Sequence, residues 1–311
     1  MTLRIGTRGS QLALWQANTV AERLTAAGAP CRIVVIKTTG DRLQEAPLSQ
    51  IGGKRLFVKE IEDALLRHEI DLAVHSSKDM PAVLPDGLII AGVLPREDPR
   101  DAVVLPSGSS FTVATIDDLV AVLGQSPSIG TGSVRRIAQL TRLFPGARFM
   151  PIRGNLDTRL RKLDEGGHDA LVLAAAGLRR LGFANRISFA LPAAACVPAP
   201  GQGIVAVEVR QDDPRVREFV ARLDDPGAGA ALAAERALVE ALGGGCQTPV
   251  GALATLVEDD MIELVAAVIA LDGSKVVRER ASAPRSEAAA LGARIGAALL
   301  AQGADEILAS V

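Results

Sequence analysis

The sequence contains few aromatic residues, which make up 3% of its 311 residues, and no tyrosine. Single-stranded nucleic acids are commonly bound by stacking bases on aromatic side chains, so the sequence offers no such platform. The net charge of −2 gives no electrostatic reason to expect nucleic acid or a membrane surface as partner. A GxxxxGK[ST] phosphate loop is missing, and the GxG fragments lack the rest of a dinucleotide fingerprint. We therefore expect no nucleic-acid partner.

Cysteine is also rare, with Cys31, Cys196 and Cys246 widely spaced along the chain. An odd number without a CxxC pair predicts neither a disulfide framework nor a zinc site. His75 and Asp79 lack an apparent third ligand, so we expect no metal. No apolar run reaches the roughly 18 residues of a membrane helix, and the first residues do not resemble a signal peptide. A reducing, cytoplasmic location fits this pattern best.

The length and the alternation of apolar runs with amphipathic stretches predict a protein of several α/β units. We expect two hinged, periplasmic-binding-protein-like α/β lobes with parallel sheets and a cleft between them. A small α+β C-terminal domain follows. The first lobe takes residues 1–95 and 197–212, the second 101–192, and the C-terminal domain 215–311. Strands are expected at 3–7, 31–39, 71–75, 87–94, 102–105, 128–130, 148–152, 169–174, 204–210, 250–257, 261–271 and 274–280, and helices at 11–27, 57–67, 115–123, 133–143, 155–165, before 181, and at 215–223, 230–242 and 286–300.

Cationic and hydroxyl side chains follow the carboxyl ends of three expected strands. They lie in Thr7-Arg8-Gly9-Ser10, in Gly130-Thr131-Gly132-Ser133-Val134-Arg135-Arg136, and at Arg153 and Arg159. Ligands bind at this edge of open α/β sheets, and the planar guanidinium of arginine pairs with carboxylate or phosphate. Helix capping and surface charge would explain any one of these groups alone. Because no phosphate loop is present, the three groups together favour a ligand with several carboxylates.

Asp79 stands in a cluster of ionisable residues, His75-Ser76-Ser77-Lys78-Asp79, at the end of an expected strand. A carboxylate next to Lys78 is expected to stay ionised, because opposite charge favours the charged form. Asp79 could then stabilise a developing cation or shuttle a proton. The alternative is a helix N-cap that forms a salt bridge with Lys78.

Cys246 follows three consecutive glycines in the run Gly243-Gly244-Gly245-Cys246-Gln247-Thr248-Pro249. Glycine allows a sharp turn and a close approach to a ligand, and Pro249 fixes the exit of that turn. The run therefore presents a thiol on a bare loop, which a buried structural cysteine does not need. The alternative is an incidental cysteine in a glycine-rich turn.

Further motifs extend this pattern along almost the whole chain, in order. They are Arg4-Ile5-Gly6-Thr7-Arg8-Gly9-Ser10, Leu12-Ala13-Leu14-Trp15-Gln16, Gly52-Gly53-Lys54, Leu56-Phe57-Val58-Lys59-Glu60, His75-Ser76-Ser77-Lys78-Asp79, Arg96-Glu97-Asp98-Pro99-Arg100-Asp101-Ala102, residues 130–136 and 153–159, Ala176-Gly177-Leu178, Pro200-Gly201-Gln202-Gly203 and Gly244-Gly245-Cys246-Gln247. With this set the sequence resembles the porphobilinogen deaminases, also called hydroxymethylbilane synthases.

The resemblance implies that Cys246 carries a covalent dipyrromethane cofactor as a thioether. Four molecules of porphobilinogen would lose ammonia and couple to it in turn, and hydrolysis would release hydroxymethylbilane. Asp79 would contact the pyrrole N–H groups and stabilise the cation that forms as ammonia leaves. The resemblance further implies cofactor binding by Lys78, Ser10, Thr131, Ser133, Arg135 and Arg136, substrate binding by Arg8, Arg153, Arg159, Arg180 and Gln202, and a lid that includes Lys54 and Phe57.

Two positions depart from the family pattern. Arg55 stands where a glycine commonly follows the lid lysine, and it adds bulk and charge. Gly132 replaces a usual serine and removes one hydroxyl donor near the cofactor. The small-molecule substrate porphobilinogen is the only partner we expect, and a monomer is the default oligomeric state.

Two other classes of protein remain as alternatives. A non-catalytic solute-binding protein also has two hinged α/β lobes, but it usually requires export and has no use for Cys246. A cysteine-dependent acyl transferase requires a histidine base. The sequence offers His68, His75 and His168, and none of them is placed by sequence near the Cys246 loop.

Overall fold

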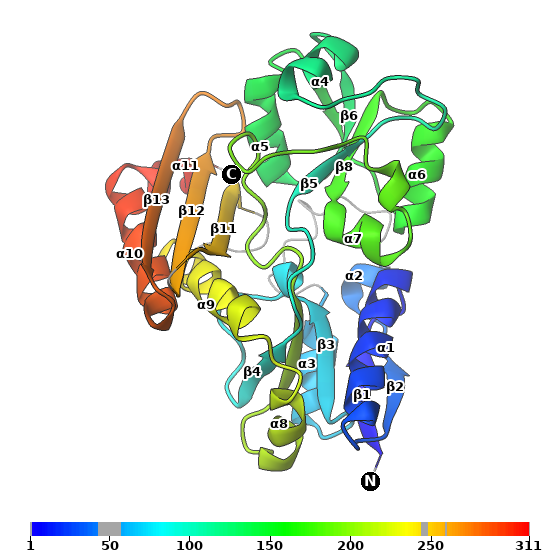
Figure 1. Cartoon of the computed structure of the whole chain (residues 1–311), viewed down its shortest axis with the longest axis vertical. Coiled ribbons are helices and arrows are strands. Elements are labelled where there is room, and N and C mark those ends of the chain that lie inside the picture. Colours follow the sequence, from blue (N-terminus) through cyan, green and yellow to red (C-terminus); the bar gives the residue numbers. More distant parts are fainter. Residues whose placement is uncertain (1, 43–56, 244–247, 259, 311) are drawn as a thin grey trace.

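The computed structural model describes residues 2–42, 57–243, 248–258 and 260–310. Their strands form three sheets, which define a first lobe, a second lobe and a C-terminal domain (Figure 1). The expected α/β fold with two lobes and a small third domain is therefore confirmed by the topology. Lys54, Arg55 and Cys246 lie outside the described residues.

The first lobe is built on a five-stranded sheet with the order β2-β1-β3-β10-β4. Strand β10 runs antiparallel to both of its neighbours, while β1 pairs in parallel with β2 and β3. The strand expected at 204–210 does return to this sheet, because its apolar residues fill the core beside β3; Val207 is fully buried there. The elements of this lobe are β1 (Leu3–Thr7), α1 (Gln11–Ala26), β2 (Cys31–Val35), α2 (Thr39–Arg42), α3 (Lys59–Leu66), β3 (Leu72–Ser76), the 3₁₀ helix η1 (Ser77–Asp79), β4 (Leu88–Val93), β10 (Val205–Arg210) and α8 (Pro214–Ala221).

The second lobe repeats this layout with the order β7-β6-β8-β5-β9, in which β5 is the antiparallel strand. Both sheets are therefore mixed, with parallel pairs as expected and one strand that runs antiparallel to its neighbours. In each sheet the antiparallel strand is the first one after the chain crosses from the other lobe. The elements are β5 (Asp101–Val104), α4 (Ile116–Leu123), β6 (Ser128–Gly130), α5 (Val134–Leu143), β7 (Arg148–Met150), α6 (Leu156–Asp164), β8 (Ala170–Ala174), α7 (Ala175–Arg180), η2 (Ala184–Arg186) and β9 (Phe189–Ala190).

Helix α8 packs on the first lobe, where Val216 and Val220 join the same apolar cluster as Val207. A domain that begins at residue 215 would separate this helix from the sheet it covers. We therefore propose that the first lobe extends through α8 and that the C-terminal domain begins with α9.

The C-terminal domain is an antiparallel sheet, β11-β12-β13, packed against helices (Figure 1). Helices α9 and α10 approach closely because Gly292 and Gly296 lack side chains: a Cβ at Gly292 would overlap the carbonyl oxygen of Ala234. The predicted hairpin at Asp272-Gly273 joins β12 to β13. The elements are α9 (Pro226–Ala241), β11 (Val250–Leu256), β12 (Met261–Ile269), β13 (Val276–Pro284), η3 (Arg285–Glu287), α10 (Ala288–Ala301) and α11 (Ala304–Ala309).

Two crossing segments, residues 94–100 and 191–204, run side by side between the lobes (Figure 1). The backbone N–H of Glu97 donates to the carbonyl of Gly203 over 3.0 Å, and Arg96 Nε donates to the carbonyl of Gln202 over 2.9 Å. Both segments also bind the buried Glu235 of α9, through Arg96 Nη1 at 2.6 Å and the backbone N–H of Gly201 at 2.5 Å. One carboxylate thus fastens both connections to the C-terminal domain.

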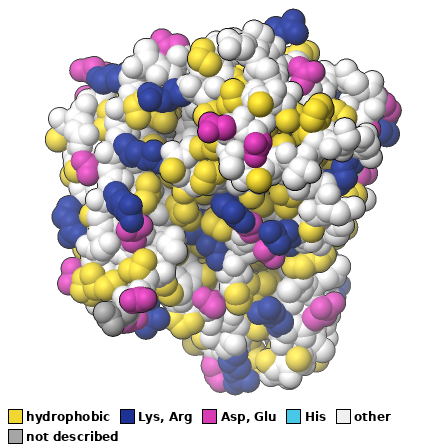
Figure 2. Space-filling view, turned by 45° about the horizontal axis from the view of Figure 1, so that its top comes forward, with side chains coloured by type: hydrophobic (Ala, Val, Ile, Leu, Met, Phe, Trp, Pro, Cys, Tyr) yellow, Lys and Arg dark blue, Asp and Glu magenta, His cyan; other side chains and the backbone are white. Residues whose placement is uncertain are grey.

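Basic and acidic side chains are mixed over the face of the molecule shown in Figure 2, and several basic ones border the hollow at its centre. Among the helices that the structure describes, none combines the length and the hydropathy needed to cross a bilayer.

Candidate active site

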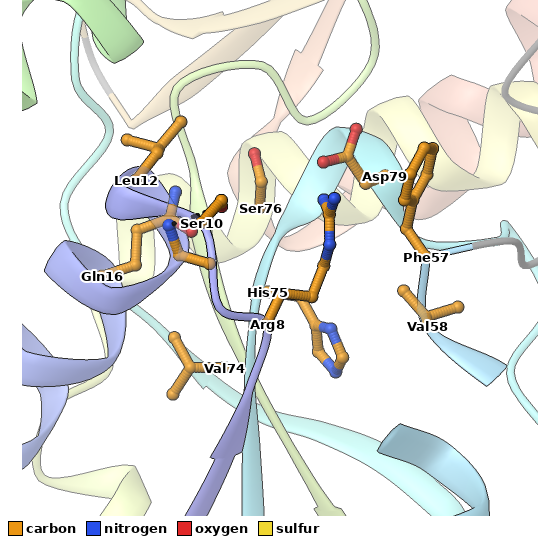
Figure 3. Close-up of a pocket in the computed structure, with 11 residues that line it drawn as sticks. Arg8, Ser10, Leu12, Gln16, Phe57, Val58, Val74, His75, Ser76 and Asp79 are labelled. Atoms are coloured by element: carbon orange, nitrogen blue, oxygen red, sulfur yellow. Dashed lines mark hydrogen bonds between the residues drawn. The ribbon is translucent and has the colours of Figure 1, made fainter. Parts of the chain in front are cut away.

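A first cavity, of about 380 Å³, opens at the carboxyl ends of β1 and β3. Arg8 and Ser10 reach it from the turn between β1 and α1, and His75, Ser76 and Asp79 reach it from β3 and η1 (Figure 3). Ser10 caps α1 as predicted, because its Oγ accepts a hydrogen bond from the backbone N–H of Ala13 over 3.3 Å. The first two polar clusters of the sequence therefore meet at one cavity.

Asp79 lines this cavity and, within the described residues, its carboxylate makes no hydrogen bond or ion pair. The alternative of an N-cap that forms a salt bridge with Lys78 is therefore not what the structure contains. The free carboxylate oxygens are available as acceptors for a ligand inside the cavity.

Arg8 lies beside Asp79 in the cavity (Figure 3). Two protein groups, the Asp41 carboxylate and the Phe57 ring, hold its guanidinium. Nη2 lies 2.5 Å from Oδ1 of Asp41, and the guanidinium carbon lies 4.4 Å from the centre of the Phe57 ring. Burial disfavours the charged form of Asp41, but Arg8 outweighs this effect and lowers the pKa of that carboxyl group. A ligand carboxylate that binds Arg8 would therefore compete with Asp41.

Two buried polar features beside this cavity, the Gln16 side chain and the pairing of His75 with Glu208, were not predicted from the sequence. Gln16 lines it from α1, and its Nε2 atom has no hydrogen-bond partner within the described residues. His75 Nε2 lies 3.0 Å from Oε2 of Glu208 on β10, and both side chains are buried. The available signal for Gln16 was its place among the apolar residues of an amphipathic helix, Ala17, Val20 and Leu24.

A second cavity, of about 630 Å³, lies where the two lobes and the C-terminal domain meet. Lys78 lines it from the first lobe, Ser133 and Arg135 from the second, and Arg236 from α9 of the C-terminal domain. Thr248, which follows directly on the segment that contains Cys246, lines it as well. Because Lys78 and Asp79 are consecutive in η1, this short helix contributes to both cavities.

Arg135 and Arg136 share one buried carboxylate, that of Asp101, which sequence reasoning missed. Arg135 donates to it from Nη1 at 2.7 Å and from Nη2 at 3.1 Å. Arg136 donates to its Oδ1 from Nε at 2.9 Å and from Nη2 at 2.7 Å. Burial opposes the charge of Asp101, but the two arginines outweigh it and hold the pKa of this carboxyl group far below its usual range.

Hydroxyl groups precede α5 at the second cavity. Ser133 occupies the N-cap position, but its side chain makes no capping hydrogen bond and lines the cavity instead. Thr131 is buried, and its Oγ1 accepts a hydrogen bond from the backbone N–H of Ser133 over 3.3 Å. A Cβ at the intervening Gly132 would meet no atom within 4 Å, so the space of the usual serine is open.

Lys78 is the third cation beside Asp101. Its Nζ donates to Oε1 of Gln202 over 3.2 Å. Burial and the neighbouring charge of Arg136 lower the pKa of Lys78 to about 8. Burial is the larger of these two causes, and an anionic ligand beside Lys78 would favour its charged form.

The arginines of the second lobe extend this positive region toward Asp79. Arg159 donates from Nε to the carbonyl of Gly154 over 2.8 Å. Burial lowers the pKa of Arg159, the charges of Arg136 and Arg153 lower it further, and the charge of Asp79 raises it. The side chain of Arg153 makes no hydrogen bond within the described residues.

Arg180 joins the lobes at the edge of the cleft. Its Nη2 donates to the carbonyl of Gly203 over 2.7 Å, and its guanidinium lies 5.6 Å from the centre of the Trp15 ring on α1. Burial lowers the pKa of Arg180. Of the described residues of the predicted set, Arg8, Ser10, Phe57 and Asp79 line the first cavity, and Lys78, Ser133 and Arg135 line the second. The remaining six line neither cavity: Thr131, Arg136, Arg153, Arg159, Arg180 and Gln202.

Comparison with known families decides among the three classes that the sequence left open. The model of the porphobilinogen deaminase dipyrromethane cofactor binding domain matches residues 3–218, and that of the porphobilinogen deaminase C-terminal domain matches residues 230–301. The chain belongs to the porphobilinogen deaminase family. The match of the first model ends inside α8, in agreement with the packing of that helix on the first lobe.

Curated members of the porphobilinogen deaminase family are similar to this chain over nearly its whole length. The porphobilinogen deaminase of Syntrophotalea carbinolica is 47% identical over 99% of this chain and 96% of its own length. That of Moorella thermoacetica is 46% identical over 99% of this chain and 96% of its own length.

Among solved structures, an ancestral cationic amino acid solute binding protein (AncCDT-1) matches 71% of this chain and 87% of its own, with 15% identity and a TM-score of 0.43. A second substrate binding domain of a putative amino acid ABC transporter from Streptococcus pneumoniae matches 78% and 94%, with 12% identity and a TM-score of 0.44. Scores this low support no inference, so the fold class rests on the sheet topology.

The residues at the second cavity fit the dipyrromethane group of the porphobilinogen deaminases. Each pyrrole ring of that group brings two carboxylates. Three cations line this cavity, Lys78, Arg135 and Arg236, and the described residues that line it include no carboxylate. Charge-assisted hydrogen bonds from arginine and lysine are well suited to such anions. The donor set therefore matches the cofactor in sign and chemistry.

Proposed function

We propose that this protein makes hydroxymethylbilane from four molecules of porphobilinogen and one of water, with loss of one ammonia per porphobilinogen and release of the product by hydrolysis, in tetrapyrrole biosynthesis. Membership of the porphobilinogen deaminase family supports this assignment. The observation that carries it is the excess of cations at a cavity whose wall includes Thr248, next to the segment of Cys246. Bound to Cys246 as a thioether, the dipyrromethane supplies the free pyrrole carbon onto which substrate units are added.

Asp79 is the catalytic residue in this proposal. Its carboxylate lines the first cavity and, within the described residues, has no competing partner, so it is available to accept hydrogen bonds from the pyrrole N–H of a bound substrate. When ammonia leaves porphobilinogen, positive charge develops on the ring. A fixed negative charge beside the ring stabilises that cation and lowers the barrier.

The cations around the two cavities bind the acetate and propionate groups. We assign Arg8, Arg153, Arg159 and Arg180 to the substrate. Arg8 lines the first cavity together with Asp79, and the charges of Asp79 and Arg153 both act on Arg159. Ser10, Lys78, Thr131, Ser133, Arg135 and Arg136 are assigned to the cofactor. Phe57 packs on Arg8 at the first cavity, which supports a lid function for Phe57 together with Lys54.

A cytoplasmic location and a monomeric state complete the proposal. The two described cysteines, Cys31 and Cys196, are both free thiols, which fits a reducing compartment. Light scattering on the purified protein should give a mass near the 32.3 kDa of one chain. A mass near twice that value would contradict the monomer.

The covalent cofactor is tested by the intact mass of the purified protein. After expression in a haem-producing host, the mass should exceed that of the polypeptide by one dipyrromethane. Cys246→Ala should abolish the added mass, whereas the matched variants Cys31→Ala and Cys196→Ala should retain it. A wild-type protein with the bare polypeptide mass would refute the proposed attachment.

The role of Asp79 is tested by Asp79→Asn, which keeps the shape of the side chain and removes its charge. We expect kcat to fall by about 10²- to 10³-fold, with the thermal midpoint and the covalent adduct unchanged. Asp86→Asn, on an exposed position a few residues further along, is the matched control and should keep normal turnover. Near-normal formation of hydroxymethylbilane by Asp79→Asn would overturn the assignment.

A further inference from the structure

The side-chain amide of Gln202 is fully occupied by protein groups. Nε2 donates to the carbonyl of Pro99 over 2.6 Å and to Oδ1 of Asp101 over 3.0 Å. Oε1 accepts the hydrogen bond from Lys78 Nζ over 3.2 Å. Because both N–H groups face acceptors, only the amide oxygen can face Lys78, and Lys78 must act as the donor. Gln202 is 1% exposed, so this arrangement is shielded from water.

The backbone on both sides of Gln202 is shaped to hold the amide in place. Gly201 and Gly203 have φ values of +73° and +89°, which favour glycine. A Cβ at Gly201 would lie 2.7 Å from Oγ of Ser77, and a Cβ at Gly203 would overlap the carbonyl oxygen of Glu97. The turn therefore packs closely against η1 and the first crossing segment, and this packing fixes the position of Gln202.

Asp101 connects Gln202 to the arginine pair of the second lobe. Its carboxylate accepts hydrogen bonds from Gln202, Arg135 and Arg136, and the thiol of Cys196 donates to its Oδ2 over 3.3 Å. Arg135 Nη1 also donates to the carbonyl of Val197 over 2.6 Å, and Arg136 Nη1 to that of Val172 over 2.8 Å. Both guanidinium groups are therefore fixed before any ligand arrives.

A continuous chain of hydrogen bonds thus crosses the boundary between the lobes. It runs from Lys78 in the first lobe, through Gln202 in the second crossing segment, to Asp101 and the arginine pair in the second lobe. Long cationic side chains normally lose conformational freedom when they bind an anion. Here that loss is already incurred in the folded protein, so the cations form a preorganised receptor.

We propose that Asp101 and Gln202 are positioning residues that set the cofactor-binding cations of the two lobes relative to one another. Asp101 fixes Arg135 and Arg136, and Gln202 fixes Lys78. The proposal rests on the proposed function, because the ligand of these cations is the carboxylate set of the dipyrromethane. It gives Gln202 a role in which the side chain needs no contact with substrate.

Two substitutions at Gln202 have opposite expected effects on Lys78. The charged groups that act on Lys78 are Arg135 and Arg136 on α5, Asp101 on β5 and Asp79 in η1. Gln202→Met removes the acceptor that favours the charged amine, so the pKa of Lys78 should fall by about half a unit. Gln202→Glu places a carboxylate beside the amine and should move the titration up by about one unit.

The titration is measured on the purified holoenzyme by competitive acylation of Lys78 across a pH series, read by peptide mass spectrometry. The alkaline limb of the pH profile of kcat/KM should shift to lower pH in Gln202→Met and to higher pH in Gln202→Glu. Intact mass reports the fraction of chains that carry the adduct, and this fraction should fall in Asp101→Asn, where the arginine pair loses its shared charge. A loss of packing alone would not shift one titration in two opposite directions.

Gln139→Met is the matched control. Gln139 is also a buried glutamine with a fully engaged amide, which donates to the carbonyl of Val197 over 3.0 Å and accepts from the backbone N–H of Val197 over 2.7 Å. Its Nε2 also donates to the backbone carbonyl of Arg135 over 3.4 Å, but its amide makes no hydrogen bond to Lys78 or to Asp101. Gln139→Met should lower the thermal midpoint to a similar extent as Gln202→Met, with the Lys78 titration unchanged.

The outcomes separate the two proposals. A wild-type protein that lacks the adduct and forms no hydroxymethylbilane would refute the proposed function. A wild-type protein with adduct and activity, together with Gln202→Met and Gln202→Glu variants whose Lys78 titration matches wild type, would refute the positioning role alone. Opposite shifts in these two variants, absent in Gln139→Met, would establish it, even where Asp101→Asn fails to fold.

Discussion

Arg8 and Asp41 form an ion pair at the first cavity, with 2.5 Å between Nη2 and Oδ1. Asp41 also accepts hydrogen bonds from the backbone N–H and the hydroxyl of Thr38, at 3.2 and 2.8 Å. The carboxylate that holds Arg8 is therefore itself held at the start of α2. A substrate carboxylate reaches Arg8 only in competition with a built-in anion.

This competition predicts that Asp41→Asn lowers KM for porphobilinogen. The asparagine keeps a hydrogen bond to Thr38 but no longer neutralises Arg8. Partly exposed ion pairs contribute up to about 1 kcal/mol, so we expect KM to fall by about threefold with kcat unchanged. Steady-state kinetics would measure this, with Glu69→Gln, in an exposed ion pair with Arg67, as the control. A higher KM would mean that Asp41 orients Arg8 for substrate.

The pair of Arg4 and Asp71 predicts a pH-dependent loss of stability in acid. Asp71 accepts hydrogen bonds from Nη2, Nε and the backbone N–H of Arg4, at 2.7, 3.0 and 2.7 Å. Burial disfavours the charge of Asp71, but Arg4 outweighs it, and the pKa of Asp71 is lowered in the folded state. Such a group stabilises the fold above its unfolded pKa, and this contribution is lost as the pH falls through the folded pKa.

The variant Asp71→Asn isolates this contribution. At pH 7 we expect it to lower the free energy of unfolding by about 2 kcal/mol, because the Arg4 guanidinium loses a bidentate partner. The difference from wild type should shrink as the pH falls below about 4, where unfolded Asp71 becomes protonated. Urea unfolding at pH 7, 5 and 3.5 would measure it. A difference that stays constant down to pH 3.5 would speak against the pair.

Substitution by serine should affect stability differently at Gly132 and at Gly203. A side chain at Gly132 meets open space and needs no unusual backbone angle, so Gly132→Ser should leave the thermal midpoint unchanged. Gly203 combines a φ of +89° with the carbonyl oxygen of Glu97 in the position of a Cβ. Gly203→Ser should therefore cost about 2 kcal/mol or more. Thermal unfolding of both variants under the same conditions provides the comparison, and an equal effect would contradict it.

Glu235 predicts how the two crossing segments depend on the C-terminal domain. Glu235→Gln leaves Arg96 buried with a weaker partner and should lower the free energy of unfolding by about 3 kcal/mol. Hydrogen exchange of the backbone N–H of Gly201 should accelerate, because this group donates to Glu235. Glu263→Gln, in an exposed ion pair with Arg280, is the control. Unchanged exchange at Gly201 would show that the segment holds its shape without Glu235.

Local patterns were sufficient to predict much of the fold. Ser10 lies just before an amphipathic stretch, and a serine in that position caps the helix that follows. The apolar run 204–210 has no neighbouring strand in sequence, which indicated its return to the first sheet. Its antiparallel direction was not predictable from local patterns, because direction depends on where the chain re-enters the sheet.

The missed residues share long-range partners. The sequence around Asp101 indicates the polar end of a linker. Its buried partners Arg135 and Cys196 lie 34 and 95 positions away. Glu235 stands in an alanine-rich helix and pairs with Arg96, 139 positions away. Periodicity carries no information about such pairs. The assignments of Cys246 and Lys54 stay predictions, since both residues lie outside the described part of the chain.

The placement of β10 between β3 and β4 has a consequence for synthesis on the ribosome. All five strands of the second sheet lie within residues 101–190, so that lobe is complete as soon as this stretch has emerged. The first sheet lacks its inner strand until residue 210 is made, and β4 has no neighbour to pair with before then. The lobe that begins the chain is therefore the later of the two to finish folding, and its unpaired β3 edge needs protection while the second lobe is being translated.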